Sequence, residues 1–157
     1  MNSGSDMQYM SLALQQAEIA RGIGEVPVGA VLVLNDGSVH AAHNAPISLH
    51  DASAHAEMRA IRAACAAVGN YRLAGSTLYV TLEPCTMCAG AIVHARIDRV
   101  VYGATDPKTG AVESLYSILS DERLNHQPEI TAGVMADACG ALLRDFFRSR
   151  RNNKPES

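Results

Sequence analysis

Two cysteines stand three residues apart in TLEPCTMC, residues 81–88, directly after a strand-like run rich in β-branched residues. In a helix that begins there, Cys85 and Cys88 would share one face near the N-terminus, where the helix dipole stabilises the thiolate that binds metals. Two soft ligands on one rigid turn suit zinc. The pair alone is a weak signal, because a chain of this size with four cysteines has such spacing by chance about one time in ten.

The stretch AHAE, residues 54–57, supplies two further candidates, because His55 begins a predicted helix as Cys85 begins another. Residues two apart on a helix point about 200° apart, so His55 and Glu57 can share a site only beyond the helix end. Three ligands, His55, Cys85 and Cys88, leave one tetrahedral position open, as in catalytic zinc sites. Glu57 beside a zinc-bound water would then be a general acid and base; without the cysteines it would be an acid favoured by the first helical turn.

The elements that position these residues follow from the spacing of apolar side chains. Helices are predicted over residues 9–22, 53–69, 84–96, 113–119 and 135–151. Strands are predicted on both sides of an Asn35-Asp36-Gly37 turn within residues 26–44, and over residues 76–83, 98–104 and 128–134. Ser53 or Asp51 is the expected N-cap of the second helix, and Pro84 is expected in the first turn of the third.

This order of elements predicts an α/β fold with a mixed sheet of about five strands and helices on both faces. The crossovers after residue 77 predict right-handed connections between parallel strands in the later part of the sheet. Because the two ligand-bearing helices begin at the ends of the same sheet, their N-termini can face each other across one cleft. The sequence therefore predicts one site formed by both helices.

The whole chain has the size of one domain, residues 1–157, and its hydrophobic content of 48% is ordinary for a globular protein. The longest apolar run, VPVGAVLVL, is too short for a bilayer, so no membrane association is expected. The N-terminus shows no secretory signal, which predicts a cytoplasmic protein with reduced cysteines. Reduced thiols favour metal binding or catalysis over disulfides.

The C-terminal part of the chain is basic although the net charge is −3. Arg144, Arg148, Arg150, Arg151 and Lys154 lie close together there. An acidic pI argues mildly against a nucleic-acid partner, whereas this cluster favours one. The alternative is a solvated helix end whose cations suit the helix dipole.

A resemblance becomes visible once these motifs are taken together. HAE followed by PCTMC resembles the H-x-E…P-C-x-x-C signature of the zinc nucleobase deaminases, in the cytidine/deoxycytidylate deaminase superfamily. The chain is most similar to the bacterial tRNA-specific adenosine deaminases, from about Met7 to Arg151. The segments that carry this similarity are EVPVGAVLV, HNAPI, DASAHAE, NYRLAGSTLYVTLEPCTMCAGAIVHARIDRVVYGATDPKTGA and LLRDFFRSRR.

The resemblance implies a cytidine-deaminase-like three-layer α/β/α sandwich, usually a homodimer, that converts adenosine to inosine at the wobble position (34) in a tRNA anticodon loop. It implies one zinc ion per subunit, held by His55, Cys85 and Cys88, with Glu57 as the proton shuttle. Other positions match residues that contact the substrate. These are Asn44, Asp106, Val26, Pro27, Leu82, Lys108, Thr109, Phe146, Arg148, Arg150 and Arg151.

Ordinary structural roles remain open for several of these residues. Asn44 and Asp106 precede prolines and are typical turn residues. Phe146 and Phe147 are adjacent in a helix, so at most one of them faces the core. Pro107 in the substrate loop makes the loop more rigid, with an effect on substrate fit that the sequence leaves open.

Three rival functions also remain open from the sequence. A deaminase of a free base or nucleoside would share the zinc group but would have no need of the C-terminal arginines. A non-catalytic zinc module that binds RNA would have no use for Glu57 beside an open coordination position. A thiol redox protein is the weakest rival, because CTMC lies late in the chain and the sequence contains no tryptophan.

Overall fold

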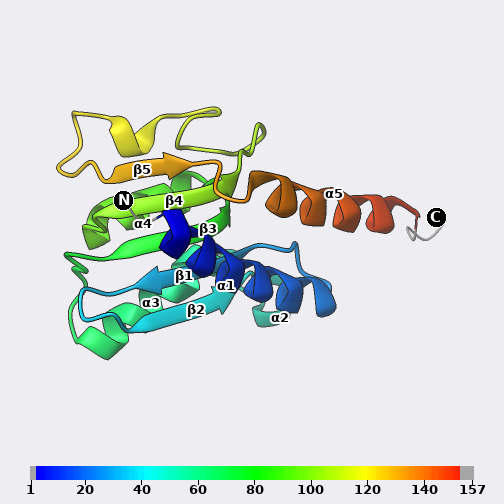
Figure 1. Ribbon diagram of the computed structural model, residues 1–157, viewed down its shortest axis with the longest axis horizontal. Helices are drawn as coiled ribbons and strands as arrows, with labels where there is room; N and C mark the ends of the chain where they lie inside the picture. The colour runs from blue at the N-terminus through cyan, green and yellow to red at the C-terminus, as the bar shows by residue number, and fades with distance from the viewer. Residues whose placement is uncertain (1–2, 153–157) are drawn as a thin grey trace.

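A mixed sheet with strand order β2-β1-β3-β4-β5 lies at the centre of the computed structural model, which describes residues 3–152 (Figure 1). Its strands are β1 (Gly29–Val33), β2 (Val39–His43), β3 (Thr77–Leu82), β4 (Arg99–Ala104) and β5 (Glu129–Ala132). β1 is antiparallel to β2 and β3, whereas β3, β4 and β5 run parallel. The predicted hairpin, the mixed sheet and its parallel half are confirmed.

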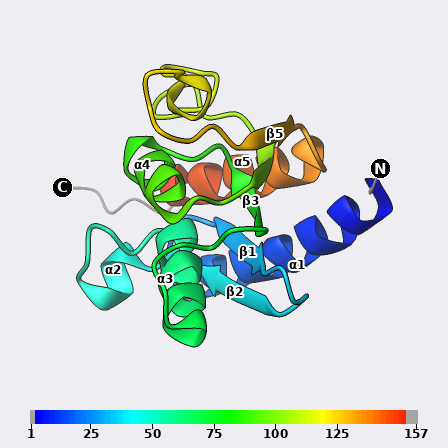
Figure 2. The ribbon, with the colours of Figure 1, turned by 90° about the vertical axis from the view of Figure 1, so that its left-hand side faces the viewer.

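Helices cover both faces of this sheet (Figure 2). They are α1 (Ser3–Gly22), α2 (Pro46–Leu49), α3 (Ala56–Val68), α4 (Thr86–Ala95) and α5 (Ala136–Asn152), with a short 3-10 helix η1 (Ile118–Ser120). α3 and α4 pack on one face, and α1 and α5 on the other. This is the expected three-layer α/β/α sandwich. No helix in the described part of the chain is long and apolar enough to cross a membrane.

The two faces of the sheet form separate hydrophobic clusters. Leu32, Leu78 and Val80 pack against α3 and α4 in the larger one. The smaller one joins α1 and α5 through Met10 and Cys139. β3 and β4 are buried along both faces, as expected for inner strands of a covered sheet. The layers therefore hold the strand ends and the N-termini of α3 and α4 in fixed positions.

The structure corrects three helix starts. α1 begins at Ser3 rather than at residue 9, because the Asp6 carboxylate is buried and accepts two hydrogen bonds of 2.8 Å from Arg99, which anchors the first turn. His55, and not Ser53 or Asp51, is the N-cap of α3. Asp51 instead accepts hydrogen bonds from Ser53 in a local turn. α4 begins at Thr86 with Cys85 as its N-cap, so Pro84 precedes the helix.

The helix predicted over residues 113–119 is wrong for most of its length. Only Ile118–Ser120 forms a short 3-10 turn there. The backbone N–H groups of Val112, Glu113 and Ser114 donate to the Glu83 carboxylate, and this side chain organises the segment as a turn. α2 was not predicted, because a four-residue helix has no apolar periodicity to detect.

Candidate active site

The N-termini of α3 and α4 meet at one edge of the sheet, and their N-cap residues face each other there. His55 Nδ1 lies 3.5 Å from the Sγ atoms of both Cys85 and Cys88, and the two Sγ atoms lie 3.7 Å apart. His55 and Cys85 both have extended backbones as the N-caps of their helices, which turns their side chains beyond the helix ends. The structure thus brings together the three predicted zinc ligands.

These distances fit one zinc ion. With Zn–S bonds of about 2.3 Å and a Zn–N bond of about 2.0–2.1 Å, tetrahedral geometry requires the two sulfurs about 3.8 Å apart and each sulfur about 3.6 Å from the nitrogen. The separations of 3.7 Å and 3.5 Å agree with that triangle. The donor set, one imidazole and two thiols, is one that zinc prefers. The sulfur separation also excludes a disulfide, whose S–S bond is about 2.05 Å.

The protonation of the sulfur atoms favours metal binding. The hydrogen bond between the Cys85 and Cys88 sulfur atoms, with a smaller contribution from His55, lowers the pKa of Cys85 to about 4 despite its burial. The same hydrogen bond and burial raise the pKa of Cys88. The pKa of His55 is raised, mainly by its hydrogen bond with Cys85. Cys85 is therefore a thiolate at neutral pH, and thiolate is the form that binds metals.

Glu57 lies in the first turn of α3, and only 4% of its surface is exposed. Burial raises the pKa of its carboxyl to about 7, against the opposing effects of a backbone hydrogen bond and of His55. A carboxyl with such a pKa can both accept and release a proton near neutral pH. Glu57 lines the same cavity as His55 and Cys85, as the sequence predicts.

The cavity beside these residues has a volume of about 170 Å³. Its lining residues are Val26, Val28, Asn44, His55, Glu57, Leu82, Glu83, Cys85, Asp106 and Thr109. The structure places five of the predicted substrate-contacting residues there. Among the described residues, Val28 rather than the buried Pro27 forms the wall next to Val26. Asn44 is held by a hydrogen bond from its side-chain amide to the Val26 carbonyl, 3.3 Å long.

Asp106 does have the turn role that the sequence left open. Its carboxylate accepts hydrogen bonds from the backbone N–H groups of Lys108 and Thr109 and a 2.6 Å hydrogen bond from the Thr109 hydroxyl. Asp106 and Thr109 still line the cavity, because the turn lies at its mouth. The segment from Asp106 to Thr109 is thus one compact unit.

A larger groove of about 750 Å³ adjoins the cavity and shares four of its lining residues, Val26, Leu82, Asp106 and Thr109. The rest of its lining comes from the same loop and from α5. These residues are Thr105, Pro107, Lys108, Leu143, Arg144, Phe147, Arg148, Arg150 and Arg151. The groove is therefore basic along α5 and opens into the Glu57 cavity. Lys154, the last member of the basic cluster, lies outside the described residues.

Of the two adjacent phenylalanines of α5, one faces the core and the other faces solvent. Phe146 is only 7% exposed and packs inside, whereas Phe147 is 45% exposed and lines the groove. The Arg150 guanidinium lies over the Phe146 ring, 5.0 Å from its centroid, and donates to the Gly24 carbonyl. Arg148 forms an exposed ion pair of 3.7 Å with Asp145. Phe146 therefore has the packing role that the sequence left open, and Phe147 is the exposed ring beside the groove.

Sequence reasoning missed Glu83, which is 2% exposed and lines the cavity. Burial opposes ionisation of Glu83, but hydrogen bonds from backbone N–H groups and from the Ser114 hydroxyl outweigh it and lower its pKa to about 2. The signal in the sequence is an acid between a buried strand and Pro84. An acid at that point is costly to bury unless it has several donors.

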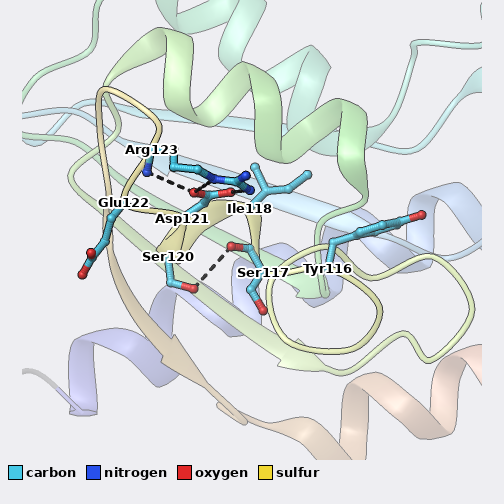
Figure 3. A pocket seen from close by; sticks show the side chains of 7 residues that line it. All are labelled: Tyr116, Ser117, Ile118, Ser120, Asp121, Glu122 and Arg123. Atoms are coloured by element: carbon cyan, nitrogen blue, oxygen red, sulfur yellow. Dashed lines mark hydrogen bonds and ion pairs between the residues drawn. The ribbon is translucent and has the colours of Figure 1, made fainter.

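A further hollow of about 700 Å³ lies in the loop around η1 (Figure 3). Its residues, Tyr116 to Arg123, do not overlap with those of the Glu57 cavity. Arg123 donates from Nε and Nη2 to the Asp121 carboxylate, 3.0 and 2.7 Å away, so these two charges pair with each other (Figure 3). The chemistry-bearing residues are therefore at the α3 and α4 N-termini and not here.

Comparison with known proteins agrees with this geometry. A family model described as the cytidine and deoxycytidylate deaminase zinc-binding region matches residues 3–104. The chain is 50% identical to a tRNA-specific adenosine deaminase of Bacillus subtilis over 149 residues, which are 95% of this chain and 92% of that protein. It is 48% identical to one of Haemophilus influenzae over 155 residues, 98% of this chain and 90% of that protein.

Solved structures give the same result. One solved structure comes from a study of A-to-I editing by tRNA:A34 deaminases at the wobble position of transfer RNA. It matches this chain with a TM-score of 0.83 and 50% sequence identity, and the match covers 87% of this chain and 99% of the solved chain. A guanine deaminase of Nitrosomonas europaea shares the fold alone, with a TM-score of 0.71 and 22% identity over 89% of this chain and 83% of its own. The matched zinc-binding region, residues 3–104, spans most of this chain. The chain therefore belongs to the cytidine and deoxycytidylate deaminase family.

Proposed function

We propose that this protein is a zinc-dependent tRNA adenosine deaminase, which converts adenosine to inosine at the wobble position (34) of an anticodon loop. The observation that carries the proposal is the direct connection between two features. The His55, Glu57, Cys85 and Cys88 group lines or adjoins a cavity, and that cavity opens into a groove with arginines along α5. The relatives with about half of their residues identical are named as tRNA-specific adenosine deaminases.

The zinc ion, one per subunit, would be held by His55, Cys85 and Cys88. When bound, it lowers the pKa of a coordinated water to about 7 and so supplies a nucleophile at neutral pH. Glu57 accepts a proton from the attacking water and donates one to N1 of adenine as water adds to C6. Glu57 then takes the proton of the new C6 hydroxyl and gives it to the amino group, the C6–N bond breaks as the C6 carbonyl forms, and water and adenosine become inosine and ammonia. Its pKa of about 7 suits both transfers.

The walls of the cavity would orient the base for this reaction. Val26, Val28 and Leu82 provide apolar contact for a flat ring, with Pro27 buried behind them. The Asn44 side chain, whose amide donates to the Val26 carbonyl, would hydrogen-bond the nucleoside with its remaining groups. Asp106 at the cavity mouth would meet the ribose. A base reaches such a pocket only when it is unstacked, which costs less in a loop than in a duplex.

The groove along α5 would hold the RNA strand on either side of the extruded nucleotide. Arg148, Arg150 and Arg151 give positive charge for phosphates, with Lys108 and Thr109 on the opposite side. Phe147, rather than Phe146, offers an exposed ring on which a neighbouring base can stack. A deaminase of free bases has no need of such a groove, and this supports RNA over a small-molecule substrate.

We further propose that residues 1–157 form one domain, that the protein acts in the cytoplasm, and that it is a homodimer. Chain length supports the first, and the tRNA named as the substrate of the relatives supports the second. The dimer follows from resemblance to its family. Sedimentation velocity of the purified protein would test the dimer directly, and a monomer across the micromolar range would contradict it.

The proposed function is tested with zinc-loaded protein and a short anticodon stem-loop that carries adenosine at the wobble position. Free guanine, adenosine and cytidine are assayed in parallel, and a stem-loop with guanosine at position 34 serves as the control RNA. Nuclease digestion and chromatography detect inosine. We expect inosine from the adenosine stem-loop and no comparable turnover of the free compounds. Turnover of a free base with unchanged RNA would keep the deaminase chemistry and overturn the tRNA substrate.

A further inference from the structure

One buried carboxylate ties the mouth of the cavity to the strand that leads into α4. Glu83 Oε1 accepts hydrogen bonds from the Asp106 backbone N–H at 3.0 Å and from the Ser114 hydroxyl at 2.5 Å. Its Oε2 accepts from the backbone N–H groups of Val112, Glu113 and Ser114 at 2.8–3.0 Å. One side chain thus receives five hydrogen bonds from both ends of the loop at residues 106–114.

The same two segments are joined by backbone contacts. The Glu83 N–H donates to the Ala104 carbonyl at 2.8 Å, and the Ala111 N–H donates to the Pro84 carbonyl at 2.8 Å. Cys85 forms an isolated β-bridge with Gly110. A side chain at Gly110 would collide with the Glu83 carboxylate, so glycine is required there for the carboxylate to enter the loop. The loop is therefore built around Glu83.

Glu83 lies between the predicted metal ligands and the loop residues that are predicted to contact the substrate. Two residues after it comes the metal-ligand candidate Cys85. The turn from Asp106 to Thr109 is held internally by the Asp106 carboxylate, and the Asp106 N–H attaches this turn to Glu83. Displacement of this attachment shifts both Asp106 and Thr109, which line the cavity and the groove.

We propose that Glu83 is a positioning residue for substrate binding: its carboxylate fixes the Asp106–Thr109 wall of the cavity at a set place relative to the metal ligands. The inference rests on the proposed function, because it assumes that a nucleotide occupies this cavity. Glu83 does not itself take part in proton transfer. It acts through Asp106 and Thr109, so its loss weakens substrate binding more than it slows the chemical step.

The test replaces Glu83 by Gln and measures KM and kcat for the adenosine stem-loop separately. Gln keeps one carbonyl oxygen but directs an amide NH2 group at backbone N–H donors, so part of the loop loses its acceptor. We expect KM to rise on the order of 10-fold while kcat at saturation stays within about threefold, as for lost uniform binding. Glu83→Asp keeps the charge on a shorter side chain and should recover part of the loss.

Two readouts are independent of turnover. Stem-loop binding is measured by fluorescence anisotropy in the inactive Glu57→Ala background, where Glu83→Gln should weaken binding on the order of 10-fold. Zinc content should stay at one equivalent per chain. Asp6→Asn is the matched control, because Asp6 is also a buried carboxylate with hydrogen-bond partners but lies outside the cavity lining. It should lower the melting temperature without changing KM.

Each outcome decides the inference. Unchanged KM and binding in Glu83→Gln, or losses no larger than those of Asp6→Asn, would overturn it. If Glu83→Gln fails to fold, Ser114→Ala removes one of the five hydrogen bonds and disturbs the same contacts more mildly, and unchanged KM in that variant would overturn it as well. If the parent protein deaminates a free base and not the stem-loop, the proposed function has failed, and the KM of Glu83→Gln for that base then tests the inference.

Discussion

The cavity around Glu57 and the groove along α5 adjoin each other, yet their side chains are held in different ways. In the cavity Asn44 and Glu83 are buried and have fixed partners: Asn44 is bonded to Val26, and Glu83 to its loop. Along α5 the arginines are exposed, and Arg148 has only a surface ion pair at 3.7 Å that contributes little. A preorganised pocket suits chemistry on one base, whereas mobile surface charges suit a flexible RNA backbone.

The largest expected effect comes from Glu57, which lines the cavity and not the groove. Glu57→Ala should lower kcat for the stem-loop by about 10³-fold or more, because it removes both proton transfers. Stem-loop affinity and zinc content should stay close to those of the parent protein, since the groove and the three ligands are intact. Full turnover by a zinc-loaded Glu57→Ala protein would contradict the role of Glu57.

Cys88→Ser tests how far the cavity depends on its metal. The variant should lose zinc, measured by atomic emission, and its melting temperature should fall by about 10 °C, because metal binding stabilises the folded state. Cys139→Ser replaces another buried cysteine, one in the smaller core cluster far along the chain from the ligands, and serves as the matched control. It should keep one equivalent of zinc. Full zinc occupancy in Cys88→Ser would disprove the ligand set.

Truncation after Phe147 tests the groove. It removes Arg148, Arg150 and Arg151 and should lower kcat/KM for the stem-loop on the order of 100-fold, because the charges that meet phosphates are lost. Zinc content should not change, since the ligands lie on α3 and α4. Equal kcat/KM for the truncated and full-length proteins would favour the rival, a deaminase of free bases.

A smaller effect distinguishes the arginines from one another. Arg148→Ala should weaken stem-loop binding and reduce the slope of log K against log salt by about 0.7, the value for one contact to single-stranded RNA. Arg150→Ala should also lower the melting temperature, because Arg150 joins α5 to the Gly24 carbonyl. Arg123→Ala, in the hollow near η1, is the control and should change neither property. An unaltered salt slope in Arg148→Ala would remove Arg148 from the RNA path.

The cavity was more predictable from sequence than the groove, for physical reasons. Zinc requires particular donors, so His55, Cys85 and Cys88 at the starts of two predicted helices, together with the resemblance to the zinc nucleobase deaminases, predict the metal site. Phe146 and Phe147 are neighbours of the same type, and only the packing of α5 decides which one is buried. An exposed arginine likewise has no spacing that distinguishes an RNA contact from a solvated helix end.

Long-range contacts account for the errors in the fold. The helix predicted at residues 113–119 failed because Glu83, about thirty residues earlier, gathers the N–H groups of residues 112–114 onto one carboxylate. The N–H groups that follow then bond the Gly110 and Ala111 carbonyls, five to seven residues earlier, and not the carbonyls four residues earlier that a helix needs. The early start of α1 depends on a pair between Asp6 and Arg99, which no local pattern reveals. The strands, the hairpin and the parallel later half of the sheet were predictable, because apolar runs, turn residues and the crossovers between strands indicate them.

The central claim, that the cavity performs the chemistry and the groove holds the RNA, is tested most directly by single-turnover deamination of the stem-loop. The double variant Arg148→Ala/Arg151→Ala is compared with the parent protein over a range of protein concentrations. We predict that the concentration for half-maximal rate rises on the order of 10-fold, while the rate constant at saturation stays within about twofold. A saturating rate constant that collapses, at unchanged half-maximal concentration, would show that the arginines act in the chemistry and would contradict this division.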